Sequence, residues 1–306
     1  MIVEGYDILI QGGQSNGVGY GLGPYDTDTL TDRDDRIVQV GRHGGDNGKI
    51  IPAFPHLHFH QAEKFSRYGY TLSLARRYAA TKLRWRRMLL IVPAAKNGSS
   101  STDWLGYLYD DMAERIRVAK ALPGANRIVL YTEHQGEADT PEPEGNIDAA
   151  IERFKANKQK FIRRFRAEFG SVPMLFGGYA PAWVERRPER EALMKATREI
   201  CEKTPNAAFV PASSLTSNRD ERIHFDAQSQ ETLSARHFLA FCNLADAAVK
   251  ARFDRWERER QTILEVMIES ICKKPMTADR QSDRLFNRPY AGVLNYLRRT
   301  LRIARD

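Results

Sequence analysis

The first 250 residues alternate short β-rich runs with longer amphipathic stretches, and this alternation limits the possible folds more than any other feature. The predicted strands are Tyr6–Gln11, Ile37–Val40, Met88–Pro93, Arg127–Thr132, Val172–Tyr179 and Ala207–Pro211. Apolar residues at helical spacing predict helices over Thr71–Leu83, Asp110–Ala121, Ile147–Phe169, Arg187–Lys203 and Gln230–Ala251. Strands that alternate with helices of this length predict an α/β fold whose mainly parallel sheet is covered on both faces.

The pattern changes past Lys250, where no further strand follows. Helical, charge-rich residues Phe253–Cys272 precede a polar stretch and a short basic helix over Val293–Ile303. We therefore predict one domain over residues 1–250 and a basic helical extension over residues 251–306. The extension holds 13 basic and 8 acidic residues, which is most of the net charge of +8. Because its charge is mixed, we expect a solvated face or a contact between copies of the chain rather than nucleic-acid binding.

Composition excludes several classes of protein. With 42% hydrophobic residues the chain can bury a core, and three cysteines are too few for a disulfide framework. The longest apolar run, Met88–Ala95, is far shorter than the roughly 20 residues of a membrane span. Acidic residues stand near the N-terminus, where a signal peptide would be basic. We therefore expect a cytoplasmic protein that does not insert into membranes.

A serine follows the first predicted strand, within Gly12-Gly13-Gln14-Ser15-Asn16-Gly17. A serine on a tight turn between a strand and a glycine-rich loop can act as a nucleophile, with backbone N–H groups around it. Ordinary turn chemistry explains the same residues. A phosphate-binding loop is disfavoured because both the Lys-Ser/Thr ending and the dinucleotide glycine spacing are missing.

Two further strands end in polar loops, at residues 94–104 and 133–139. Gly98 in the first loop lets the backbone approach a substrate closely. Gln135 in the second loop carries a carboxamide that can donate to a developing oxyanion. Each loop alone is also consistent with unremarkable surface structure.

A histidine with nearby acids stands late in the chain, in Asp220-Glu221-Arg222-Ile223-His224-Phe225. A serine nucleophile needs such an imidazole as its base, and a carboxylate to orient the ring. The alternating histidines His56, His58 and His60 could instead indicate a metal site, although such a run more often lines a loop or cleft.

These segments in this order resemble the SGNH hydrolases, and most closely their sialate O-acetylesterase and acetylxylan esterase branch. The matching residues are Gly-Gln-Ser-Asn around Ser15, Val92–Ser99 with Trp104, His134-Gln135-Gly136-Glu137, and Ile223-His224-Phe225. The resemblance spans about Tyr6 to Ala248. It implies a three-layer α/β/α sandwich with a flavodoxin-like sheet, and an esterase domain that deacetylates sugars without a metal or other cofactor.

Carried over by position, the resemblance makes Ser15 the nucleophile and His224 the base. Backbone N–H groups of Ser15 and Gly98 and the side chain of Gln135 would form the oxyanion hole. The family's carboxylate precedes the histidine by three residues, which favours Glu221 over the adjacent Asp220. We further expect four neighbouring residues to contact the substrate: Gln14, Asn16, Asn97 and Glu137.

Three positions differ from the family pattern: Gly17 replaces a frequent Met, Asn97 replaces a Gly, and Glu221 replaces an Asp. The leading hypothesis is a carbohydrate O-acetylesterase that works through an acetyl-enzyme and whose substrate is an acetylated carbohydrate. A sugar O-acyltransferase and a non-catalytic carbohydrate-binding protein remain alternatives. Oligomers through the C-terminal helices are a further possibility.

Overall fold

A seven-stranded sheet with the strand order β3-β2-β4-β1-β5-β6-β7 runs through the protein. The strands are β1 (Gly5–Gly13), β2 (Ile37–Val40), β3 (Ile50–Pro52), β4 (Arg87–Pro93), β5 (Arg127–His134), β6 (Met174–Gly177) and β7 (Ala207–Val210). All neighbouring strands pair in parallel except β3, which is antiparallel to β2. This computed structural model describes residues 3–23, 34–53, 57–60, 67–141, 145–247 and Arg255.

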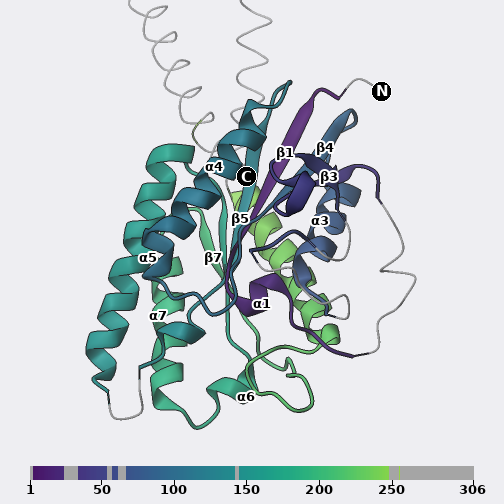
Figure 1. The fold of residues 1–306 in the computed structure, drawn as a ribbon. Helices are drawn as coiled ribbons and strands as arrows, with labels where there is room; N and C mark the ends of the chain where they lie inside the picture. Colours follow the sequence, from purple (N-terminus) through teal and green to yellow (C-terminus); the bar gives the residue numbers. More distant parts are fainter. Residues whose placement is uncertain are drawn as a thin grey trace, which may run out of the picture. The chain divides into compact units, whose positions relative to one another are not determined.

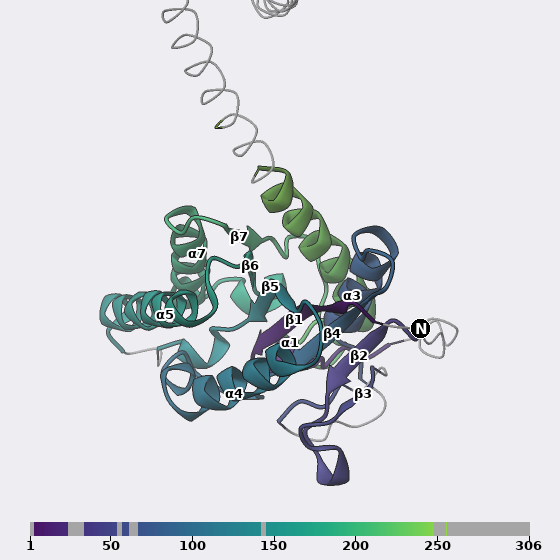
Figure 2. The same ribbon diagram turned by 90° about the horizontal axis from the view of Figure 1, so that it is seen from above.

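Helices connect the strands and cover both faces of the sheet. They are α1 (Ser15–Val18), α3 (Tyr70–Thr81), α4 (Tyr107–Ala121), α5 (Ile147–Phe169), α6 (Pro181–Val184) and α7 (Pro188–Glu202), and residues 227–247 are also helical. Three short 3₁₀ helices are η1 (Gly44–Asp46), η2 (Asp103–Leu105) and η3 (Glu137–Asp139). Figures 1 and 2 show α4, α5 and α7 on one face, with α3 and helix 227–247 on the other.

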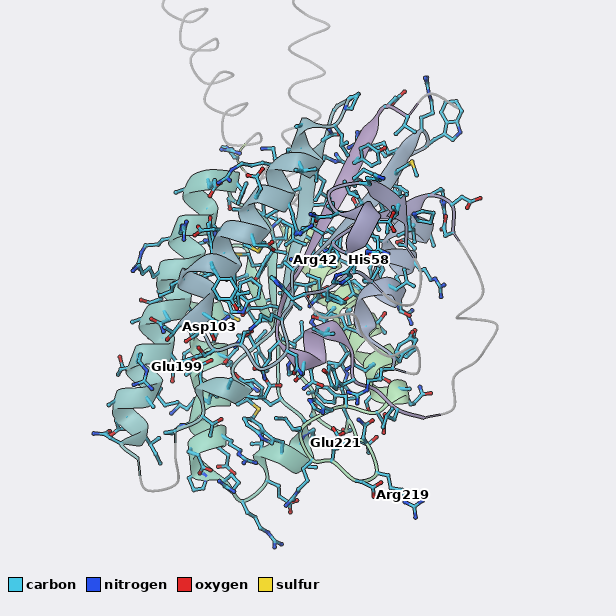
Figure 3. All side chains as sticks on the ribbon, in the orientation of Figure 1. Arg42, His58, Asp103, Glu199, Arg219 and Glu221 are labelled. Carbon is cyan, nitrogen blue, oxygen red and sulfur yellow. The ribbon has the colours of Figure 1, made fainter. Side chains whose placement is uncertain are left out.

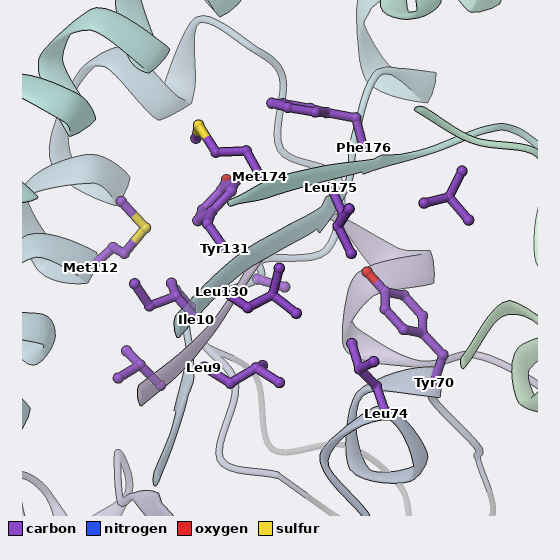
Figure 4. Packing of buried hydrophobic residues seen from close by; sticks show 14 of the residues in the cluster. Leu9, Ile10, Tyr70, Leu74, Met112, Leu130, Tyr131, Met174, Leu175 and Phe176 are labelled. Carbon is purple, nitrogen blue, oxygen red and sulfur yellow. The ribbon is translucent and has the colours of Figure 1, made fainter. Parts of the chain in front are cut away.

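The core lies between the sheet and these two helical layers. In β1, Ile8, Leu9 and Ile10 are completely buried, as expected of a central parallel strand with helices on both faces. Figure 4 shows Met112 of α4 on one side of the strands and Tyr70 of α3 on the other. The predicted α/β fold with a mainly parallel sheet is therefore confirmed.

The helix α5 illustrates how local sequence sets an element's bounds. The Asn146 side chain accepts a hydrogen bond from the N–H of Ala149 at 2.9 Å and caps the first turn. Phe154, Phe161 and Phe165 form its buried stripe. The helix ends at Gly170, whose φ of 87° suits glycine and stops the helical hydrogen bonding. The predicted bounds coincide with the observed ones.

Most other predicted elements shift by only one to three residues. The sequence analysis missed β3, α1 and α6, because three- and four-residue elements give no measurable periodicity. The predicted extension 251–306 lies outside the described residues except for Arg255, and its boundary stays a prediction. Among the helices that the structure describes, none is both long and apolar enough to cross a membrane.

Candidate active site

Ser15 stands where β1 ends and α1 begins, at the carboxyl edge of the sheet (Figure 1). Ligands of open parallel sheets bind beyond this edge. The turn requires glycine at residue 13, because its φ is 98° and an added Cβ would lie 2.2 Å from the carbonyl oxygen of His134. The turn that presents the Ser15 side chain at the sheet edge therefore depends on glycine at residue 13.

Ser15, His224 and Glu221 form a hydrogen-bonded chain. The Oγ of Ser15 lies 3.0 Å from Nε2 of His224, and Nδ1 of His224 contacts Oε2 of Glu221. With the proton on Nδ1 directed at Glu221, Nε2 is free to accept the Ser15 hydroxyl proton. The neighbouring Asp220 is exposed to solvent, whereas Glu221 points toward the ring (Glu221 is labelled in Figure 3). The order of the groups is that of a serine hydrolase triad.

The segment after α1 fixes the loop that carries His224. The side chain of Asn218 accepts from the N–H of Leu22 at 2.8 Å and donates to the carbonyl of Tyr20 at 2.8 Å. The ring of Tyr20 stacks on the imidazole of His224, with 4.6 Å between centroids. Its hydroxyl accepts a hydrogen bond from Nδ2 of Asn97 at 2.8 Å. Tyr20 therefore connects His224 to the loop that follows β4.

Sequence reasoning missed Tyr20, and it assigned Asn16 to the substrate. The Asn16 side chain is completely buried and bonds the backbone on both sides of His224. Its Nδ2 donates to the carbonyl of Ile223 at 3.0 Å, and its Oδ1 accepts from the N–H of Phe225 at 3.2 Å. Because Asn16 follows Ser15 directly, this clamp sets the position of His224 relative to Ser15. The only sequence signal for Tyr20 is an aromatic residue between two glycines after the serine.

Behind the clamp lies a buried pair formed by the imidazole of His134 and the carboxyl group of Glu137. Nδ1 of His134 is 3.0 Å from Oε1 of Glu137, and both side chains are almost inaccessible. Burial disfavours both charges, but attraction outweighs it, so the pKa of His134 is raised and that of Glu137 is lowered. Glu137 also accepts hydrogen bonds from the side chains of Gln14 at 2.6 Å and Asn16 at 2.9 Å.

The four side chains that we expected to contact the substrate therefore bond to other groups of the protein. Gln14, Asn16 and Glu137 bond to one another, and Asn97 bonds to Tyr20. These bonds hold the three loops of the site together. A direct contact between any of the four and a sugar stays a prediction.

The loop at residues 94–104 lies against the end of β1. The N–H of Lys96 donates to the carbonyl of Gly13 at 2.9 Å. Gly98 is exposed with a φ of 68°, a left-handed conformation that favours glycine. Within the described residues its N–H donates to no protein group, as expected of a group available to a ligand.

The carboxamide of Gln135 is fully engaged beneath this loop. Its Nε2 donates to the carbonyl of Ser99 at 2.7 Å, and its Oε1 accepts from Nε1 of Trp104 at 3.0 Å. Gln135 is buried, and its second hydrogen faces Asp139 at 3.4 Å. The structure thus places Gln135 as a support of the loop, and its donation to an oxyanion stays a prediction.

His58 and His60 belong to a different cluster of side chains, with Arg42 and Asp111, near the end of β2. The Nδ1 of His58 accepts from the backbone N–H of Arg42 at 3.3 Å, and Nε of Arg42 donates to the carbonyl of His58 at 3.3 Å (both residues are labelled in Figure 3). His60 lies 3.5 Å from Asp111, and burial together with Arg42 lowers the pKa of His60 to about 4. His56 is outside the described residues, among which no three metal-ligating side chains are placed to hold an ion.

Comparison with known proteins identifies the family of this chain. The sequence model described as carbohydrate esterase, sialic acid-specific acetylesterase matches residues 5–243. The chain belongs to this family. Among the curated proteins, none matches the chain. Membership of the carbohydrate esterase family confirms the predicted enzyme class and the coarse function, deacetylation of carbohydrates.

Solved structures similar to this family member share its fold at low sequence identity. A protein from Arabidopsis thaliana is 19% identical, with a TM-score of 0.63 over 78% of this chain and 98% of the other. NanS is 18% identical, with a TM-score of 0.61 over 81% and 99%. A carbohydrate acetylesterase from Xanthomonas citri is 17% identical, with a TM-score of 0.57 over 79% and 57%.

Proposed function

We propose that the protein is a serine esterase that removes O-acetyl groups from a carbohydrate through an acetyl-enzyme. The observation that carries this proposal is the contact of 3.0 Å between Oγ of Ser15 and Nε2 of His224. The distance is within hydrogen-bond range, so the imidazole can take the proton as the hydroxyl oxygen attacks. The family assignment independently supports an acetylated carbohydrate as the substrate.

The reaction proceeds in two halves. Oγ of Ser15 attacks the acetyl carbonyl while Nε2 of His224 accepts the hydroxyl proton, and Glu221 stabilises the imidazolium. The tetrahedral intermediate collapses when His224 returns that proton to the departing sugar oxygen, which leaves an acetyl ester on Ser15. Water, deprotonated by His224, then attacks this ester and releases acetate, and Ser15 regains its proton.

Two backbone amides support the oxyanion in this proposal. α1 begins at Ser15, so the Ser15 N–H has no intrahelical acceptor. The Gly98 N–H lies in the loop that the Lys96–Gly13 bond attaches to the end of β1. A donor directed at developing negative charge contributes about 10²–10³ in rate in the example best studied.

Replacing Ser15 by Ala tests the proposal. Removing a triad nucleophile costs on the order of 10⁶-fold in kcat, so hydrolysis of p-nitrophenyl acetate should fall to background. The matched control is Ser171→Ala at an exposed position outside the site, which should keep wild-type activity. A fluorophosphonate should label the wild type and the control but not Ser15→Ala. Full activity in Ser15→Ala would refute a serine mechanism, and an unlabelled, inactive wild type would favour a non-catalytic carbohydrate-binding protein.

A further inference from the structure

The loop at residues 94–104 contains a tight turn whose tip carries Gly98, the proposed second oxyanion donor. The N–H of Ser99 donates to the carbonyl of Lys96 at 3.3 Å, so Asn97 and Gly98 are the two central residues of a β-turn. The φ of Gly98 is 68° whereas that of Asn97 is not positive, and this combination is that of a type II turn. The Gly98 N–H thus belongs to the central peptide unit of the turn.

Hydrogen bonds to the rest of the protein hold both ends of this turn. The N–H of Lys96 donates to the carbonyl of Gly13 at 2.9 Å. Ser99 is buried, its Oγ donates to the carbonyl of Lys96 at 2.8 Å, and its carbonyl accepts from Nε2 of Gln135 at 2.7 Å. The two ends therefore cannot move without breaking contacts at the edge of the sheet, but none of these bonds reaches the tip.

The tip itself is held by a single side chain. Nδ2 of Asn97 donates to the hydroxyl of Tyr20 at 2.8 Å. In the part of the chain that the structure describes, Asn97 and Gly98 make no other hydrogen bond. Gly98 is exposed and has no side chain that could anchor it. The placement of the tip, and with it of the Gly98 N–H, therefore depends on the side chain of Asn97.

Tyr20, the acceptor of this bond, is fixed from several sides. The residue that follows it forms an antiparallel bridge with Tyr68, whose two backbone hydrogen bonds measure 3.0 and 2.9 Å. The carbonyl of Tyr20 accepts from Nδ2 of Asn218 at 2.8 Å. The Tyr20 ring lies 4.1 Å from the guanidinium carbon of Arg67 and stacks on the imidazole of His224. One hydrogen bond to Tyr20 thus sets the tip of the turn relative to the proposed base.

We propose that Asn97 is a positioning residue, whose hydrogen bond to Tyr20 keeps the Gly98 N–H directed at the oxyanion. This inference rests on the proposed esterase function and adds to it a residue that does not touch the reacting atoms. Between type I and type II turns the central peptide unit turns over, so that a carbonyl replaces the N–H. A carbonyl oxygen there would repel the developing negative charge. The bond opposes this change, because it restrains Asn97, one of the two residues whose dihedral angles must change.

Removing either partner of the hydrogen bond tests the proposal. Asn97→Ala and Tyr20→Phe should each lower kcat for p-nitrophenyl acetate about threefold, the worth of one net hydrogen bond, with KM nearly unchanged. Both half-reactions pass through an oxyanion, so kcat falls whichever half is slower. Because this ester contains no sugar, the loss cannot come from a sugar contact of Asn97. The double variant should also lose about threefold, since both substitutions remove the same bond.

Asn157 of α5 provides the matched control. Its Nδ2 donates to the hydroxyls of Ser101 at 3.1 Å and Thr102 at 3.0 Å, so it holds the same loop away from the turn. Asn157→Ala removes the same amide group and should keep the wild-type kcat. A loss in Asn97→Ala no larger than in Asn157→Ala would overturn the proposal. A loss of about ninefold in the double variant, the product of two independent effects, would overturn it as well.

A measurement on the Gly98 amide separates this inference from catalysis. In protein with ¹⁵N-labelled glycine, the chemical shift and relaxation of that amide report its conformation and motion without any ester. Its signal is assigned by its loss in Gly98→Ala. A shifted or more mobile amide in Asn97→Ala and Tyr20→Phe, but not in Asn157→Ala, would support the anchoring even if no ester were hydrolysed. An amide with the same shift and order in the wild type and these three variants would refute it, whatever the fate of the esterase proposal.

Discussion

At the residue scale, Glu221 and Asp220 are adjacent, yet only Glu221 contacts His224. Glu221→Gln should lower kcat on a small acetyl ester by about 10²–10⁴-fold, up to the cost measured for the orienting aspartate of a serine protease. Asp220→Asn is the matched control, and its kcat should stay near wild type because the Asp220 side chain is exposed. Steady-state kinetics of both variants show which of the two carboxylates orients the ring of His224. The reverse ranking would mean that Asp220 orients the ring, and two silent variants would leave Ser15 and His224 as a dyad.

Tyr20 is the second residue whose role can be tested directly. Tyr20→Leu removes the stack on His224 and the acceptor for Asn97, so kcat should fall about threefold to tenfold, the usual worth of an aromatic pair. Tyr20→Phe keeps the ring and loses only the hydroxyl, so it should lose less. Equal losses in the two variants would show that the hydroxyl, rather than the stack, positions the base.

The sequence predicted the three residues of the proposed triad, but it did not reveal the side chains that hold them in place. Ser15, Glu221 and His224 stand at motif positions, and the structure brings their side chains together. The stacking of Tyr20 and the clamp made by Asn16 depend on contacts between distant loops, for which spacing along the chain carries no signal. Reading Asn16 as a substrate contact follows from its place beside the nucleophile, which does not reveal that the side chain is buried.

At the scale of elements, the buried pair of His134 and Glu137 joins the end of β5 to η3. If the pair is charged, Glu137→Gln should destabilise the fold by about 3–5 kcal/mol, because a buried charge on His134 then loses its partner. The matched control Glu114→Gln, whose side chain is 66% exposed and pairs with Arg117 on the surface, should change stability by about 1 kcal/mol or less. Urea unfolding of each variant measures both effects.

The pH dependence of that loss distinguishes a charged pair from a neutral hydrogen bond. The lowered pKa of Glu137 makes its contribution full above the ordinary value of 4.5, and acid removes it. The raised pKa of His134 makes its contribution full below the ordinary value of 6.5, and alkali removes it. The stability difference between wild type and Glu137→Gln should therefore be largest between these values. A difference that does not change with pH would show that the pair is neutral.

The longer helices and strands could be predicted because the spacing of their apolar residues along the chain indicates which side chains are buried. The strand β2 and the helix α5 have the predicted bounds, since three of the four residues of β2 are β-branched and three buried phenylalanines mark α5. β3 has only three residues, all partly exposed, at the antiparallel edge of the sheet. Such an element is defined by its partner strand, and no local pattern reveals it.

At the scale of the whole molecule, every residue assigned to the site lies within the unit Met1–Ala248. We therefore expect a chain shortened to residues 1–250 to fold and to keep the kcat/KM of the full chain on a small acetyl ester. Circular dichroism should show an unchanged melting temperature within a few degrees. A shortened chain that unfolds or loses activity would make residues 251–306 part of the esterase domain. The predicted self-association through that extension can be measured on the same two chains by sedimentation.

The proposed triad joins the beginning and the end of this unit, since Ser15 and His224 are 209 residues apart. A contact between such distant residues requires a long loop to close, which costs conformational entropy before the contact contributes. A nascent chain that has already produced the β1 serine still lacks its base, and a partly refolded chain has both groups but no clamp between them. In the proposed mechanism, the capacity to attack an ester therefore arises only in the completely folded molecule, so we expect incomplete chains not to react with esters.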